Sequence, residues 1–471
     1  MTILLSAADR AALRFFVPTA LPAMRNNSRC ARAIAAATIA LAGPVSALAP
    51  GEDGVIHTIA VSGISDVAHA VAIDPGGNIV LVGSAGGNYS ALARITPSGA
   101  ADLSFGTGSG IATPDFSSST GGDGLLAIVR TSDGGYVACG PFNSNPTTGN
   151  DFFVARFGSS GALDGTFNGV GYAVTAFTAT ASNEQCNAVA VQTDGMIVSA
   201  GYRSASGHLH VALTRHTALG ALDANFGNGG KLDIDASANL SGDSEATALL
   251  VQPDGQLLVA GYALGSGTDD FLVMRLNAAD GTPDATFGTG GITRTPIGTG
   301  EDIAYAMVLQ PNGRIVLAGS TYAPDGHRDF ALARYTTGGV LDPDFSGGKV
   351  TTAVGPSDDY AFALLLMPWG RIVAAGSARI NTSNAETDLA IVAYNADGTL
   401  DRFFGNAGKR MLSISSLADS VYGLASDISG ARFWVVGTAA AGMNPNQDFL
   451  AVEFGLPDTI FRHGFDTNTA P

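Results

Sequence analysis

The segment Val251-Gln-Pro-Asp-Gly-Gln-Leu-Leu-Val-Ala-Gly261 decides the fold of this chain, because close variants of it recur along the sequence. Its Asp-Gly pair supplies the positive φ angles that a tight hairpin needs, and the apolar run that follows is typical of a strand. Successive copies end in glycines that are 57 to 61 residues apart. The end glycines are Gly83, Gly140, Gly201, Gly261, Gly319, Gly376 and Gly437.

A second block, Asp-x-x-Phe, keeps the same period. Each unit also contains four runs of strand-like composition, bounded by turn residues. In the fifth unit these runs cover residues 304–310, 314–319, 330–335 and 348–353. The Asp-x-x-Phe copies begin at Asp102, Asp164, Asp223, Asp284, Asp342 and Asp401, and a weakened seventh copy begins at Asp458.

Four antiparallel strands repeated seven times predict an all-β fold, a seven-bladed β-propeller. The competing interpretations are a solenoid and a row of β-sandwich domains. Separate sandwich domains would not keep one period with the same Asp-x-x-Phe block in every unit. A solenoid needs capping ends. The N-terminal segment 51–60 instead resembles the stretch after each Asp-x-x-Phe block, which the last unit lacks. We therefore expect residues 55–61 to pair near 449–454 and complete the last blade, which removes an open sheet edge.

The unit resembles the delta-60 repeat family. The resemblance rests on Val251-Gln-Pro-Asp-Gly255, Asp329-Phe-Ala-Leu-Ala-Arg-Tyr335 and Gly398-Thr-Leu-Asp401. It covers about residues 54–461 and implies a propeller found in secreted or surface proteins of bacteria. It implies no established activity.

Composition restricts the classes of partner. The chain of 471 residues has 46% apolar residues, 62 glycines and a formal net charge of -17. The apolar content excludes a disordered chain. The negative charge argues against nucleic acid as a partner, because a phosphate backbone would be repelled.

The first 47 residues have the pattern of an export signal. Arg25, Arg29 and Arg32 precede a short apolar run, and small residues follow before Ala47. This order of a positive end, an apolar core and a cleavage site predicts a secreted or periplasmic bacterial protein. The signal fits best if translation starts at Met24. A membrane anchor is the alternative, but the run is shorter than the roughly 20 residues that span a bilayer. We expect a signal region at 1–47, one propeller at 48–461 and a tail at 462–471, with no membrane span in the mature chain.

The third strand of five units carries an arginine. An unpaired buried charge is unfavourable, so we expect each arginine to bind the repeated aspartate of its own unit. The predicted pairs include Arg334 with Asp342 and Arg275 with Asp284. The arginines are Arg94, Arg156, Arg215, Arg275 and Arg334, and the equivalent positions in units six and seven are Ala393 and Glu453.

An acidic residue recurs where the first strand begins. If the first strand is innermost, these acids surround one mouth of the central channel. Oxygen ligands suit Ca²⁺ or Mg²⁺, so the ring is a candidate Ca²⁺ site; the alternative is a set of hydrogen-bonded turns. The ring comprises Asp66, Asp123, Glu184, Glu245 (or Asp243), Asp302, Asp359 and Asp419.

Two further residue pairs stand out. Cys139 and Cys186 are expected to approach each other in neighbouring blades, and an exported protein could join them by a disulfide; two separate small apolar side chains are the alternative. His208 and His210 share one face of a strand. No third metal ligand is visible beside them, so we interpret them as surface residues.

The sequence contains no Ser-His-Asp order, zinc motif or phosphate loop. We therefore expect a secreted, monomeric, non-catalytic propeller that acts as a binding or interaction scaffold for a protein, glycan or small molecule. The alternative is a secreted hydrolase or lyase that uses a cation held by the acidic ring. A fold that hosts both kinds of function does not decide between them.

Overall fold

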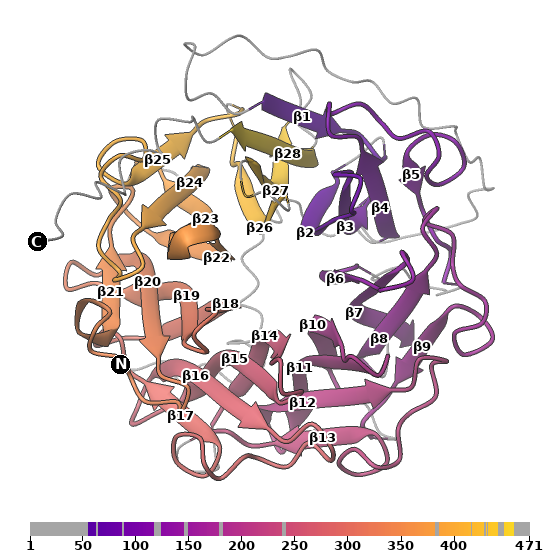
Figure 1. The fold of residues 1–471 in the computed structure, drawn as a ribbon, viewed down its shortest axis with the longest axis horizontal. Coiled ribbons are helices and arrows are strands. Elements are labelled where there is room, and N and C mark those ends of the chain that lie inside the picture. The colour runs from indigo at the N-terminus through magenta and orange to yellow at the C-terminus, as the bar shows by residue number, and fades with distance from the viewer. Residues whose placement is uncertain are drawn as a thin grey trace, which may run out of the picture.

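Seven four-stranded antiparallel sheets stand around a common centre and form a closed ring (Figure 1). The predicted seven-bladed β-propeller is therefore confirmed. The computed structural model describes residues 55–62, 65–86, 89–116, 124–145, 149–178, 182–237, 242–381, 386–415, 417–427, 430, 432–440 and 447–455. The predicted signal region, residues 1–47, and the tail, residues 462–471, lie outside these residues, and no described helix is long and apolar enough to cross a membrane.

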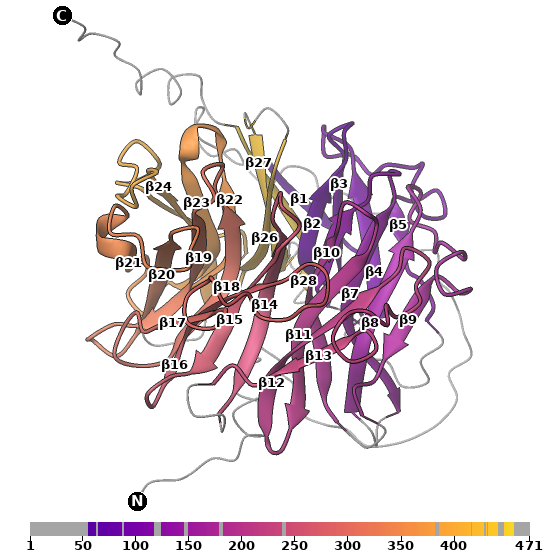
Figure 2. The ribbon, with the colours of Figure 1, turned by 60° about the horizontal axis from the view of Figure 1, so that its bottom comes forward.

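Each sheet is one blade, and its strands run in chain order from the channel outward (Figure 1). Figure 2 shows the blades standing side by side around the ring. Blades 1 to 3 are β2 (Val67–Ile73), β3 (Ile79–Ala85), β4 (Tyr89–Ile95) and β5 (Ile111–Ala112); β6 (Ala127–Arg130), β7 (Tyr136–Asn145), β8 (Gly149–Phe157) and β9 (Tyr172–Thr175); and β10 (Glu184–Val191), β11 (Ile197–Ala205), β12 (His208–His216) and β13 (Lys231–Ile234).

The later blades repeat this pattern, and two short 3-10 turns interrupt them. Blades 4 and 5 are β14 (Ser244–Val251), β15 (Leu257–Leu264), β16 (Asp269–Leu276) and β17 (Ile292–Thr295); and β18 (Asp302–Leu309), β19 (Ile315–Tyr322), β20 (Arg328–Tyr335) and β21 (Lys349–Thr352). Blades 6 and 7 are β22 (Asp359–Leu366), β23 (Ile372–Arg379), β24 (Thr387–Tyr394) and β25 (Lys409–Leu412); and β26 (Ser420–Ser426), β27 (Arg432–Ala440), β28 (Gln447–Gly455) and β1 (Val55–Ile59). The turns are η1 (Ser346–Gly348) and η2 (Pro368–Gly370).

The N-terminal strand closes the ring. β1 pairs antiparallel with β28, from Val55 opposite Glu453 to Ile59 opposite Phe449. Because β1 is the outer strand of blade 7, a segment from the start of the chain completes a sheet built from its end (Figure 1). The predicted pairing is confirmed, and the exposed edge that an open array would leave is absent at this junction.

The apolar core lies between the blades. Seven buried clusters are present among the described residues, and each draws side chains from two neighbouring blades. One cluster, for example, joins Val137 and Cys139 of blade 2 to Cys186 and Val189 of blade 3. Burial of apolar surface therefore holds the blades to one another.

Close backbone approach explains why each repeat ends in glycine. This residue faces the innermost strand at the point where the two backbones are closest, which leaves no room for a side chain. A Cβ added to Gly319 would lie 1.9 Å from the backbone oxygen of Ile303, and the other six end glycines have the same close approach, at 1.8 to 1.9 Å. The next residues of the inner strand form a β-bulge, with Tyr305 between the paired Ala304 and Ala306. The sequence repeat thus places a bulge beside the channel in six of the seven blades.

Candidate functional site

The repeated arginine and aspartate form an ion pair in each of the first five blades. In blade 5, Nε of Arg334 lies 2.8 Å from Oδ2 of Asp342, and both side chains are buried. The guanidinium carbon also lies 4.7 Å from the centre of the Phe345 ring. The predicted contact of Arg334 is confirmed, as is that of Arg275 with Asp284. The remaining pairs are Arg94–Asp102, Arg156–Asp164 and Arg215–Asp223.

This group also joins each blade to the next. Nη1 of Arg334 donates a hydrogen bond to the carbonyl of Ala396 in blade 6, at 2.5 Å. Phe345 packs on Gly398 of blade 6, where an added Cβ would lie 3.0 Å from the ring. We call this set of Arg, Asp, Phe and next-blade Gly the junction lock. The same ring-on-glycine contact recurs for Phe105 on Gly161, Phe226 on Gly281 and Phe287 on Gly339.

Blades that lack the arginine use a substitute. In blade 6, Nη2 of Arg371 lies 2.8 Å from Oδ2 of Asp401, so an arginine from the second strand pairs with the repeated aspartate. In blade 7, Nη1 of Arg432 lies 3.1 Å from Oε1 of Glu453. The third-strand charges therefore have a structural role. In blade 4, hydrogen bonds from Thr286 and the ion pair with Arg275 hold the pKa of Asp284 below its ordinary value.

The acidic ring lies where the inner strands begin. Its carboxylates accept hydrogen bonds from the chain segment that crosses from the outer strand of one blade to the inner strand of the next. Asp359 accepts from the backbone N–H groups of Val354 at 2.6 Å and Gly355 at 2.9 Å. Asp66, Glu184, Asp302 and Asp419 accept equivalent bonds from their own crossing segments.

For two members of the predicted acidic ring, Asp123 and Glu245, the described residues do not show this hydrogen bond to the crossing segment. Asp123 lies outside the described residues. In blade 4 the hydroxyl of Ser244 accepts the bond from the crossing segment, from the N–H of Ala236 at 3.1 Å. Glu245 is one residue further on, and Oε2 accepts a hydrogen bond from the Tyr262 hydroxyl at 2.5 Å. The described residues contain no group of three or more His, Cys, Asp or Glu side chains that could hold a metal ion. The Ca²⁺ site stays a prediction.

A second acid, from the third strand of the preceding blade, accompanies five of these residues. Burial and the charges of Asp329 and Asp358 raise the pKa of Asp359 to about 6, although hydrogen bonds oppose the shift. Burial and the charge of Asp302 raise the pKa of Asp270, also to about 6. The five junction pairs are Asp151–Glu184, Asp270–Asp302, Asp329–Asp359, Asp388–Asp419 and Asp448–Asp66.

A ring of seven side chains lies deeper in the channel. Six inner strands carry a β-bulge at the same place, and Leu126 has the equivalent position directly before β6 of blade 2. All seven residues are partly exposed, although their neighbours in the strands are mostly buried. We call them the bulge ring: His69, Leu126, Asn187, Thr247, Tyr305, Phe362 and Tyr422.

The bulge ring is asymmetric. Four consecutive blades contribute aromatic side chains, and these rings contact one another across the blade boundaries. The ring centres of Tyr305 and Phe362 are 5.0 Å apart, those of Phe362 and Tyr422 are 5.5 Å apart, and those of Tyr422 and His69 are also 5.5 Å apart. We call these four residues the aromatic arc. Figure 1 shows the inner strands β2, β18, β22 and β26 of these four blades around the centre of the ring. Side chains from four sheets meet only where the sheets converge, so we infer that the aromatic arc lies at this centre.

Two polar residues of the bulge ring, Asn187 and Thr247, form hydrogen bonds with the next blade. The amide of Asn187 donates to Oε1 of Glu245 and to the carbonyl of Ala246, both at 2.9 Å. The hydroxyl of Thr247 donates to the carbonyl of Ala304 at 2.9 Å. Each bond crosses to the next blade, so these two polar residues join blades. Outside the aromatic arc, Leu126 is the one apolar residue of the bulge ring.

A buried arginine extends the aromatic arc toward one mouth. Arg328 lies at the start of β20, and its guanidinium carbon is 4.2 Å from the centre of the Tyr322 ring and 5.9 Å from that of Tyr360. Nη2 lies 2.7 Å from Oε2 of Glu301. The Tyr360 ring is stacked parallel to Phe362 at 5.6 Å. Arg328 and these tyrosines depart from the repeat, and they gather at one junction.

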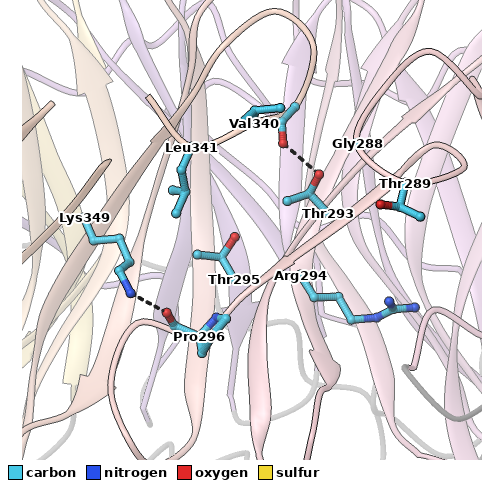
Figure 3. Close-up of a pocket in the computed structure, with 10 residues that line it drawn as sticks. Gly288, Thr289, Thr293, Arg294, Thr295, Pro296, Val340, Leu341 and Lys349 are labelled. Carbon is cyan, nitrogen blue, oxygen red and sulfur yellow. Dashed lines mark hydrogen bonds between the residues drawn. The ribbon is translucent and has the colours of Figure 1, made fainter. Parts of the chain in front are cut away.

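A separate hollow lies on the outside of the ring, where β17 of blade 4 meets blade 5 (Figure 3). Its volume is about 440 Å³. Three of its polar side chains donate hydrogen bonds to backbone carbonyls. Lys349 donates to the carbonyl of Pro296 and Thr293 to that of Gly339, each at 2.8 Å. Arg294 donates to a carbonyl of blade 3 at 2.5 Å. These contacts make the hollow a weaker candidate than the channel.

The cysteine prediction is confirmed. Cys139 of β7 and Cys186 of β10 form a disulfide with a Cα–Cα distance of 5.9 Å. Both residues are fully buried, so the bridge lies inside the core between blades 2 and 3.

The two histidines of β12 face acids. Nδ1 of His210 lies 2.8 Å from Oδ1 of Asp233, and Nδ1 of His208 lies 3.7 Å from Oδ1 of Asp243. His208 is more exposed than His210. The interpretation of both residues as surface side chains therefore holds only in part, because the His210 side chain is 19% exposed.

The aromatic arc was missed by sequence reasoning. The signal was present, because the arc residues lie 14 residues before the end glycine in blades 1, 5 and 6, and 15 before it in blade 7. The positions that the copies share serve the fold, whereas the arc lies at a position where the copies differ. A channel site is found by comparing what they do not share at one position.

Comparison with protein families supports a β-propeller repeat. Four segments match the family model described as "Domain of unknown function (DUF5122) beta-propeller", at residues 131–167, 252–287, 310–345 and 370–404. Each segment starts at or near the turn between the first two strands of a blade and ends at the Asp-x-x-Phe block. No curated protein matches the chain significantly.

Three solved structures match this chain at low sequence identity. A catalytically inactive variant of virginiamycin B lyase from Staphylococcus aureus, in complex with quinupristin, is 10% identical with a TM-score of 0.44, and the match covers 86% of this chain and all of that one. Two structures of Sqt1 from Chaetomium thermophilum are 14% and 15% identical, with TM-scores of 0.40 and 0.41. Those matches cover 80% of this chain and 80% or 81% of the other.

Proposed function

We propose that this chain is an exported, non-catalytic β-propeller built from delta-60 repeats that binds a ligand in its central channel. The aromatic arc is the observation that supports this proposal. Most repeated positions serve the fold, since the junction lock and the end glycine occupy them. The bulge ring differs, because its residues vary from blade to blade and stay partly exposed where the blades converge. Aromatic surface with a few polar groups is typical of ligand sites.

Other features are consistent with export. The disulfide between Cys139 and Cys186 suits an oxidising compartment outside the cytoplasm. The segment 1–47 has the pattern of a secretory signal. Ring closure by β1 leaves no blade in need of a second chain, so we propose a monomer.

A binding screen tests the proposal. Purified protein is screened for thermal stabilisation against small molecules, oligosaccharides and short peptides, because a ligand that binds only the folded state raises the melting temperature. Each hit is repeated with Phe362→Ala. The matched control is Phe177→Ala, which lies on the crossing segment between blades 2 and 3 and outside the bulge ring.

We expect hits that Phe362→Ala weakens and Phe177→Ala preserves. Hits that both variants preserve would place the site elsewhere and overturn the channel proposal. Elemental analysis of the same sample tests the alternative function, an enzyme with a cation at the acidic ring. Stoichiometric Ca²⁺ would favour that alternative.

A further inference from the structure

The aromatic arc lies directly inside the acidic ring. In four blades the ring acid and the arc residue are three residues apart in the inner strand: Asp66 and His69, Asp302 and Tyr305, Asp359 and Phe362, and Asp419 and Tyr422. Three residues of a strand span about 10 Å. A group that enters the channel from this mouth would therefore pass the acids before it reaches the aromatic rings.

Acids also dominate the wall around this mouth. Asp270, Asp329, Asp388 and Asp448 add a second carboxyl at four of the junctions that hold the ring acids. Each of these four residues is the first or second residue of its third strand, so the pairs share one end of the propeller. Most of these carboxyls are buried in the blade junctions, so they act on a ligand through their field and not by contact. Charges of one sign in low-dielectric walls concentrate the opposite charge in the space between them.

The arc itself carries little charge that could oppose a cation. Phe362, Tyr305 and Tyr422 are uncharged at neutral pH. His69 joins them as a neutral ring, because burial lowers its pKa to about 4. The faces of aromatic rings are electron-rich and attract cations, and rings arranged around one point recognise quaternary ammonium groups.

Resting on the channel-binding function proposed above, we propose that the aromatic arc binds the cationic group of a small organic ligand, such as a quaternary ammonium. The chain offers an internal example at the same junction. The guanidinium of Arg328 already lies over Tyr322, with Glu301 as its counter-ion. Further along the arc, no described cation–π contact involves Phe362 or Tyr422.

Choline and its uncharged isostere 3,3-dimethylbutan-1-ol test the charge requirement. The two molecules have the same shape, so their affinities, measured by calorimetry, differ only through the positive charge. We expect choline to bind at least about tenfold tighter, the scale of a desolvated cation–π contact. Raising the salt concentration should weaken choline binding only slightly, because buried acids are screened much less than exposed ones.

Phe362→Leu tests the place of binding. Leucine keeps an apolar side chain but removes the aromatic face, so we expect choline affinity to fall about tenfold. Phe177→Leu is the control and should bind choline as the wild type does. Equal affinity of the two isosteres, or unchanged choline binding by Phe362→Leu, would overturn the cation site.

These failures differ from failure of the proposed function. If neither isostere binds but the broader screen finds hits that depend on Phe362, channel binding stands and the ligand class is wrong. If no hit depends on Phe362, both proposals fall.

Discussion

The carboxyl pair at the closing junction gives a quantitative prediction. Asp448 lies in β28 and Asp66 at the start of blade 1, where the two ends of the ring meet. Asp448 is 6% exposed. Burial raises its pKa to about 6, and the charge of Asp66 adds to the shift. In an unfolded chain the same carboxyl has a pKa of about 3.9.

The direction of the pH effect follows from these two values. The folded state holds the Asp448 proton more tightly than the unfolded state does. The stability that this provides is complete below about pH 3.9 and is lost as the pH rises through about 6. A shift of about two units corresponds to about 3 kcal/mol. Above pH 7 the wild type therefore carries a buried, repelled carboxylate.

Asp448→Asn should remove most of that unfavourable energy. We expect its free energy of unfolding to exceed that of the wild type by up to about 3 kcal/mol at pH 8, with little difference at pH 4. Urea unfolding at both pH values measures this. Asp344→Asn is the control, because that side chain is 75% exposed and its replacement should change stability by less than about 0.5 kcal/mol. A variant that is destabilised at pH 8 would refute the reasoning, since the carboxylate would then make an interaction stronger than its burial penalty.

Three further predictions concern the joints between blades. Arg215→Ala should lower the free energy of unfolding by about 3 kcal/mol, because a mostly buried carboxylate loses its partner. Arg334→Ala should have a smaller effect in the same urea titration, since Arg314 also pairs with Asp342, and equal losses would contradict this difference. Replacing Cys139 and Cys186 by alanine should destabilise by about 4 kcal/mol for a 47-residue separation, and two free thiols in the unreduced wild type would exclude the bridge. Deleting residues 48–63 should expose the edge of β28 and cause aggregation, measured by light scattering, whereas a monomer with unchanged melting would disprove the closure role.

Much of the fold could be predicted because the repeat is strict. A tight turn, an apolar strand and an end glycine recur in seven blades, and each element has a local physical cause. The turn needs positive φ at Gly313, and the approach of the inner strand leaves no room for a side chain at Gly319. The pairing of Arg334 with Asp342 followed from the need to compensate a buried charge.

The site could be predicted only in part. The acids of the ring were found by counting from the end glycine, but the count does not show what a carboxylate binds. The hydrogen bonds that Asp359 accepts from Val354 and Gly355 depend on how the crossing segment folds back. In blade 4 the same count leads to Ser244, and Glu245 points to Tyr262 instead.

The aromatic arc could not be predicted without the ring geometry. Tyr305 and Phe362 are far apart in the sequence, and nothing local indicates that their rings lie 5.0 Å apart. Their contact arises from the convergence of separate sheets on one axis. The position of Arg328 beside Tyr322 and Tyr360 also follows from the fold of β20 and its neighbours, and the sequence alone does not indicate it.

The junction lock has a direction, and this bears on how such a chain can grow. Blades 1, 3, 4 and 5 each extend an arginine and a phenylalanine forward to the next blade, where a glycine receives the ring, as Gly398 receives Phe345. An in-frame duplication of one such repeat would therefore add a blade together with its own contacts to the next blade. The existing junctions would still pair an arginine and a phenylalanine with a glycine. At the closing junction His57 of β1 lies against Gly99, whereas Phe105, Phe226, Phe287 and Phe345 lie against the corresponding glycines of blades 2, 4, 5 and 6. A ring with an added blade would still have to close through the pairing of β1 with β28, so a change in blade number has to be accommodated at that junction.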